Sequence, residues 1–71
     1  MQLTEKQKQQ IKQFYTENLD GLELELEEVV EDTLDYMIDE GHIDLSNDED
    51  GDIYESYNNI VWEYIEDEVM S

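Results

Sequence analysis

An acidic imbalance limits the folds that are open to this chain. All but one of its 22 acidic residues follow Gln13, whereas its only bases, Lys6, Lys8 and Lys12, precede that position. The formal net charge is −19 over 71 residues, and self-repulsion of this kind opposes a compact state. Residues 22–41, LELELEEVVEDTLDYMIDEG, contain nine carboxylates and no Lys or Arg. Any stable fold must therefore hold the carboxylates at the surface.

The rest of the composition favours a folded protein over an acidic disordered one. Apolar residues make up 38% of the chain, which also contains five Tyr, one Trp and one Phe. The 71 residues suit a single domain, 1–71, which is too small for an enclosed substrate cleft. Without Cys, neither a disulfide framework nor a thiolate metal site is available. The chain lacks the apolar run of a signal peptide or a membrane span, which predicts a cytoplasmic protein.

The first of three predicted helices runs from about Thr4 to Asn18. Thr4 followed by Gln7 fits a capping box, which marks the start of a helix. The apolar face of this helix consists of Leu3, Ile11, Phe14 and Tyr15. Its outer face is polar and carries little charge.

The second predicted helix follows a turn at residues 18–21, with Asp20 as its candidate N-cap, and stops at Gly41. Its apolar stripe consists of Leu22, Leu26, Val29, Val30, Leu34, Met37 and Ile38. Its opposite side consists of Glu28, Glu31, Asp32, Asp35 and Asp39. The alternation LELELE at the start also fits a β-strand, which is the alternative for that stretch.

The third predicted helix begins at Gly51 or Asp52 and reaches the C-terminus, after an irregular segment with a short extended stretch at 43–45. Its core stripe consists of Ile53, Tyr57, Ile60, Val61, Tyr64 and Ile65. Tyr54, Trp62 and Val69 widen the apolar arc to roughly 200°, more than one packing face needs. The helix therefore packs against both others, or it exposes a surface around Trp62 and Val69 through which a homodimer forms. The predicted fold is an all-α, three-helix domain with a single core.

The acidic side of the second helix opposes folding. Five like-charged pairs lie four residues apart: Glu23/Glu27, Glu27/Glu31, Glu28/Asp32, Glu31/Asp35 and Asp35/Asp39. At roughly 0.2–0.5 kcal/mol each they cost about 1–2.5 kcal/mol, whereas a domain of this size has only about 3–5 kcal/mol to spare. Interspersed lysines would keep the protein soluble without this penalty. Solubility alone is therefore a poor explanation, and the charge is predicted to be the functional surface.

The geometry of this surface suggests a nucleic-acid backbone. Twenty helical residues span about 30 Å, so nine carboxylates give one charge per roughly 3.3 Å, against about 3.4 Å per phosphate in one DNA strand. The predicted partner is a basic nucleic-acid-binding protein, since repulsion excludes direct binding to nucleic acid or anionic membranes. The predicted contact residues are Glu28, Glu31, Asp32, Asp35, Asp39, Asp48, Asp50, Asp52, Glu63, Glu66 and Asp67.

In its size and its acidic runs, the chain resembles the small phage-borne DNA-mimic inhibitors. The runs are LELELEEVVEDTLDYMIDEG, SNDEDGDIYES and VWEYIEDEV. That group includes anti-CRISPR and anti-restriction proteins and inhibitors of uracil-DNA glycosylase or nucleoid proteins. The likeness is one of charge and size and involves no shared motif, so no residue roles transfer. It implies a non-enzymatic inhibitor in the cytoplasm of a bacterial host, which blocks a DNA-binding protein by competition. The N-terminal lysines depart from the pattern and are expected to lie away from the mimic surface.

Other interpretations remain open from the sequence. The run SNDEDGDIYESY echoes a calcium loop, but Ser46 and Tyr57 occupy positions where acidic ligands belong, so a turn that caps the third helix is the simpler expectation. His42 suits a helix C-terminus better than catalysis, because no nucleophile lies at a recognisable spacing. No metal or cofactor is predicted. The alternative function is an acidic interaction module that binds a basic partner through the apolar arc, with Trp62 as a hydrophobic anchor.

Overall fold

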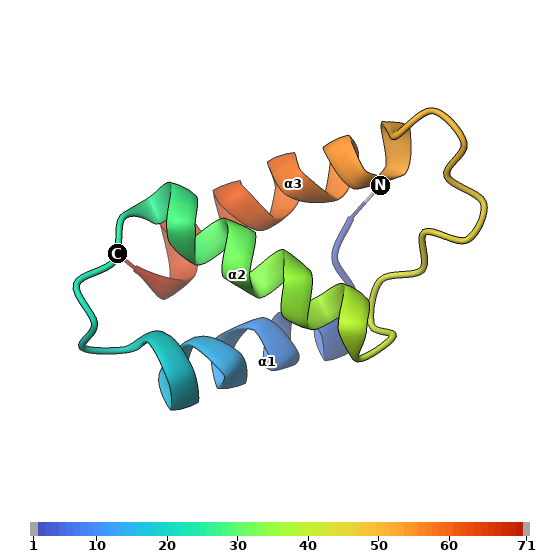
Figure 1. Cartoon of the computed structure of the whole chain (residues 1–71). Helices are drawn as coiled ribbons and strands as arrows, with labels where there is room; N and C mark the ends of the chain where they lie inside the picture. Colours follow the sequence, from blue (N-terminus) through green and yellow to red (C-terminus); the bar gives the residue numbers. More distant parts are fainter. Residues whose placement is uncertain (1, 71) are drawn as a thin grey trace.

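Three helices make up most of the protein in the computed structural model, which describes residues 2–70 (Figure 1). Helix α1 (Glu5–Phe14) continues into a π-helical turn, η1 (Tyr15–Leu19). Helix α2 (Leu26–Asp39) follows, and helix α3 (Asp52–Tyr64) continues into a second π-helical turn, η2 (Ile65–Val69). Residues 2–70 contain no β-strand, so the all-α prediction is confirmed and the strand alternative for LELELE is wrong. Met1 and Ser71, the first and last residues of the predicted domain, lie outside the described residues. The predicted end of the third helix at the C-terminus therefore also lies outside them.

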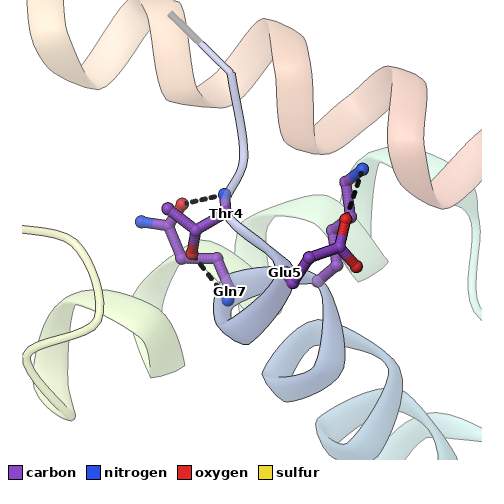
Figure 2. Close-up of polar contacts among 4 residues, drawn as sticks. Thr4, Glu5 and Gln7 are labelled. Atoms are coloured by element: carbon purple, nitrogen blue, oxygen red, sulfur yellow. Dashed lines mark hydrogen bonds and ion pairs between the residues drawn. The ribbon is translucent and has the colours of Figure 1, made fainter.

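The capping box at Thr4 begins α1 as the sequence predicts. Thr4 Oγ1 accepts a hydrogen bond from the Gln7 N–H at 3.0 Å, and the Gln7 side-chain oxygen accepts one from the Thr4 N–H at 2.9 Å (Figure 2). These bonds satisfy donors that lack partners at a helix start. Glu5 and Lys8 form an ion pair at 3.7 Å beside the box, but Glu5 is almost fully exposed, so the pair contributes little stability.

Helix α2 begins later than the sequence predicts. Glu25 occupies its N-cap position without a side-chain hydrogen bond, and the predicted N-cap Asp20 instead ends η1. The reason is a left-handed backbone at Gly21 (φ 87°) and Glu23 (φ 55°), which interrupts the helical path. Leu22 consequently lies outside the apolar stripe and is 57% exposed. The predictions of Asp20 as N-cap and of Leu22 as part of the core face are wrong.

Helix α2 ends in a Schellman motif at Gly41. Gly41, with φ 77°, donates its N–H to the Ile38 carbonyl at 3.1 Å, and the His42 N–H donates to the Met37 carbonyl at 2.8 Å. The His42 carbonyl then accepts a hydrogen bond from Gln7 Nε2 at 2.9 Å, which links α1 to this turn. The predicted stop at Gly41 is therefore confirmed.

One hydrophobic core lies between the three helices. Its buried apolar side chains are Ile11, Leu19, Val29, Val30, Leu34, Met37, Ile43, Val61 and Ile65. At its edge the rings of Phe14 and Tyr36 stack with their centroids 4.4 Å apart, and the Tyr36 hydroxyl donates to Gln10 Oε1 at 3.1 Å. Thr33 is also fully buried, but its hydroxyl has no hydrogen-bond partner among the described residues.

The helices form a short rod. Figure 1 shows α2 between α1 and α3, antiparallel to both, so that η1 and η2 lie at the same end of the molecule. The rod measures 36 × 19 × 18 Å along its principal axes. Among the helices of residues 2–70, none combines the length and the apolar character needed to cross a lipid bilayer.

Candidate partner-binding surface

A row of carboxylates runs along the solvent side of α2. We name it the α2 acidic row, and it consists of Glu28, Glu31, Asp32, Asp35 and Asp39. The opposite side of the helix, which includes Val30, Leu34 and Met37, is buried in the core, so packing holds the row outward. Asp32 is partly buried and the other four are exposed. The structure thus brings these predicted residues together on one face.

The charge density of α2 is close to that of a DNA strand. The helix has 14 residues and therefore spans about 21 Å. The acidic row and Glu27 together supply one carboxylate per roughly 3.5 Å of helix axis, against about 3.4 Å per phosphate in one strand. The 30 Å expected from the sequence is too long, because Glu23 and Glu25 precede the helix. The charge per unit length nevertheless stays as predicted.

Repulsion within α2 is slightly smaller than the sequence suggests. Four like-charged pairs lie four residues apart within the helix: Glu27/Glu31, Glu28/Asp32, Glu31/Asp35 and Asp35/Asp39. The fifth predicted pair, Glu23/Glu27, lies across the helix start. The four pairs cost about 0.8–2 kcal/mol in total, and α2 contains no Lys or Arg to offset them.

The Asp48 side chain caps helix α3. The sequence predicted a cap from this loop but did not identify the residue. Its Oδ1 accepts a hydrogen bond from the Ile53 N–H and its Oδ2 one from the Tyr54 N–H, both at 3.1 Å. The N-cap residue of α3 is Gly51, which has φ 80° and no side chain, so Asp48 caps the helix from three residues further back. This carboxylate is therefore less available to a partner than the prediction assumed.

The remaining acids of the 44–52 loop differ in their surroundings. Asp50 and Asp52 are exposed, as a binding surface requires. Asp44 accepts a hydrogen bond from the Ser46 N–H at 2.9 Å, and this bond, aided by the Ser46 hydroxyl, lowers the pKa of Asp44 below its usual 3.8. Nowhere in residues 2–70 do three or more His, Asp or Glu side chains gather in a way that could hold a metal ion. The cap formed by Asp48 agrees with the simpler of the two interpretations of this loop.

The predicted acids on α3 and η2 do not all share one face. Glu63, Glu66 and Asp67 are exposed, but Glu63 and Asp67 border a hollow that also contains Lys8 of α1. The hydrogen bond from the Met70 N–H to the Ile65 carbonyl, at 2.8 Å, marks the π-helical turn that alters the spacing after Tyr64. The sequence prediction assumed a regular α-helix after Tyr64 and therefore did not include this change of register.

Trp62 is covered in part by its own fold. Trp62 and Val69 are partly buried and pack against the core, so much of the wide apolar arc serves the packing of α3. Tyr54 is 38% exposed at the N-terminal end of the helix. Only part of the Trp62 side chain is therefore accessible to act as the predicted hydrophobic anchor.

The lysines lie on α1, whereas the acidic row lies on α2. Lys8 Nζ and Lys12 Nζ each lie 6.0 Å from the centre of the Tyr64 ring. Because Lys8 shares a hollow with Glu63 and Asp67, the separation between lysines and predicted contact residues is incomplete on the α3 side. The charge on the rod is thus uneven, with α2 purely acidic and α1 carrying every Lys.

Comparisons with known proteins give no relative from which a function could be transferred. No protein-family model matches the chain, and no curated protein or solved structure shows significant similarity to it. Function must therefore be inferred from the surface described above.

Proposed function

We propose that this protein is a DNA-mimic inhibitor that occupies the basic nucleic-acid-binding groove of a bacterial DNA-binding or defence protein. Such targets include a CRISPR effector, a restriction enzyme, a DNA glycosylase or a nucleoid protein. The observation that carries the proposal is the match of charge to length. A duplex carries one charge per about 1.7 Å, so 36 Å of duplex has about 21 negative charges. The protein is 36 Å long and has 22 acidic residues with a net charge of −19.

The α2 acidic row is the rigid part of the proposed mimic. A helix held by a buried core presents its carboxylates without further ordering, which lowers the entropy lost on binding. The repulsion of about 0.8–2 kcal/mol within α2 is consistent with this role, because complementary cations of a target would relieve it. Asp50, Asp52 and Glu66 are exposed and are proposed to add to this surface, whereas Asp48 mainly caps α3.

Inhibition follows from competition for the same cations. Lys and Arg side chains that hold phosphates would form ion pairs with the row instead, so DNA and the protein could not bind together. The large negative field would also speed the encounter with a positively charged groove. Both effects weaken as salt rises, because the charges are exposed.

The test is capture of targets from a bacterial lysate on the immobilised protein, with elution by duplex DNA. We expect proteins that are retained at low salt, released by duplex DNA, and identified by mass spectrometry as DNA-binding. The triple variant Asp32→Lys, Asp35→Lys and Asp39→Lys should lose this capture while circular dichroism shows unchanged helix content.

A matched control carries the same change of net charge elsewhere. The control variant is Glu17→Lys, Asp20→Lys and Glu23→Lys, which changes exposed residues of η1 and the following loop. It should retain most of the capture. If the α2 triple variant captures the same proteins as the wild type, the acidic row is not the contact surface and the proposal fails.

A further inference from the structure

A groove runs along the rod between α1 and the α3–η2 segment. Three neighbouring hollows form it, and they share residues from one to the next. Lys8 and Tyr64 line the first two hollows, Lys12 lines the second and third, and Glu68 lines all three. The groove thus follows α1 from its first turn to η1.

The two walls of the groove differ in charge. The α1 wall has Lys8 and Lys12, with Glu5 paired to Lys8 at 3.7 Å. The α3–η2 wall has Glu63, Asp67 and Glu68 and carries no base. Tyr64 lies between them, with both lysine Nζ atoms 6.0 Å from its ring centre. Apolar atoms of Leu3 and Ile60 also line the groove. A partner that fits must therefore present an acidic edge to α1 and a basic edge to α3–η2.

We propose that a second copy of this chain occupies the groove and forms a two-fold symmetric dimer. A two-fold axis parallel to the helices places α1 of one copy over α3–η2 of the other, without a shift along the rod. Since Lys8 and Lys12 already lie level with Tyr64 and Glu68, each copy sets its lysines against the acidic wall of its partner. The contact is isologous, so both complementary pairs of walls form at once.

The size and charge of this face suit such a dimer. The whole projected face of 36 × 19 Å is about 700 Å² per copy and about 1,400 Å² for two, so a contact that covers most of it reaches the 1,200–2,000 Å² of standard interfaces. The solvent side of α2 carries six carboxylates and no Lys or Arg, so copies with a net charge of −19 repel each other there. On the groove face, Lys8 and Lys12 weaken this repulsion. In the dimer the two α2 acidic rows remain outside the contact.

Sedimentation or light scattering on the isolated protein tests the dimer. We expect the mass to rise from 8.5 kDa to twice that value as concentration increases. The variant Lys8→Glu/Lys12→Glu, which makes both walls acidic, should remain monomeric. The control Lys6→Glu/Gln13→Glu adds acids to α1 outside the groove and should still dimerise. A wild type that stays monomeric at every concentration overturns the proposal.

A charge swap distinguishes the proposed contact from a general effect of charge. The variant Glu63→Lys/Glu68→Lys has two basic walls and should also be monomeric alone. Mixed with Lys8→Glu/Lys12→Glu, it should form a heterodimer, because both contacts then pair opposite charges. Failure of the mixture to associate, with both variants folded by circular dichroism, contradicts the two-fold arrangement.

Disulfide trapping tests the alignment of the two copies, because the natural chain has no Cys. A mixture of Gln9→Cys and Glu68→Cys proteins should form a cross-linked dimer on oxidation. A mixture of Gln9→Cys with Glu31→Cys on the α2 acidic row should not. Equal cross-linking in both mixtures would mean random collision. No binding partner enters these measurements, so their outcome is independent of the proposed inhibition.

Discussion

Replacement of Asp48 by Ala is predicted to destabilise the protein much more than the same change at its neighbour Asp50. The Asp48 carboxylate accepts two N–H groups of the first turn of α3, each at 3.1 Å, and it lies near the positive end of the helix. Loss of a cap of this kind costs about 0.5–2 kcal/mol. With two bonds to a partly buried carboxylate, we expect the upper half of this range, about 1–2 kcal/mol.

Asp50→Ala is the matched control because Asp50 is exposed and both variants remove one negative charge. Relief of self-repulsion is therefore similar in the two proteins, and their difference isolates the cap. Since 1 kcal/mol shifts the Tm of a domain of this size by about 4–8 °C, Asp48→Ala should melt roughly 5–15 °C below Asp50→Ala. Circular dichroism at 222 nm during heating measures this difference. Equal Tm values for the two variants would refute the assignment of Asp48 as the cap.

Three further perturbations follow from the structure. Thr33→Val removes a buried hydroxyl that has no partner, so the free energy of unfolding should rise by about 1–3 kcal/mol in denaturant titrations; a decrease would mean that the hydroxyl is satisfied. The pKa of Asp44 is lowered by its bonds to Ser46, so this stabilisation is complete above pH 3.8 and is lost as pH falls through the lower folded pKa. NMR titration of the Asp44 carboxyl should give a midpoint below 3.8 that returns toward that value when Ser46 is replaced by Pro, which removes both donors. Trp62→Ala should lower Tm by loss of packing but leave salt-sensitive capture of targets intact; loss of capture by the folded variant would instead favour the alternative interaction module.

The fold was accessible from the sequence because local signals and burial agree over most of it. The side chains of Thr4 and Gln7 form the capping box that begins α1, as predicted. Gly41 adopts the left-handed backbone conformation that ends α2, also as predicted. The apolar spacing from Val29 to Met37 is long enough to define one buried face. These features also determine which side of α2 carries the acidic row.

The errors lie where the backbone departs from a regular period. Leu22 and Leu26 are four residues apart and so look like one helical face, but Gly21 and Glu23 adopt left-handed conformations between η1 and α2. The cap from Asp48 was missed as a specific contact because it reaches across a loop, whereas sequence patterns identify caps directly before a helix. The π-helical turns were missed because each has only five residues at the end of a helix, too few for a wider register to be recognised from apolar spacing.

Displacement of labelled duplex DNA from a captured target tests the central claim most directly. The wild-type protein should compete with the duplex for one site, with an affinity that falls steeply as salt rises. Reversal of Asp32, Asp35 and Asp39 to Lys should weaken displacement at least about 100-fold, since three lost contacts of about 1 kcal/mol each amount to about 3 kcal/mol. The η1 and loop control should stay within about tenfold of the wild type. If DNA and the protein bind the target simultaneously, or if both variants lose affinity equally, the α2 carboxylates do not replace phosphates.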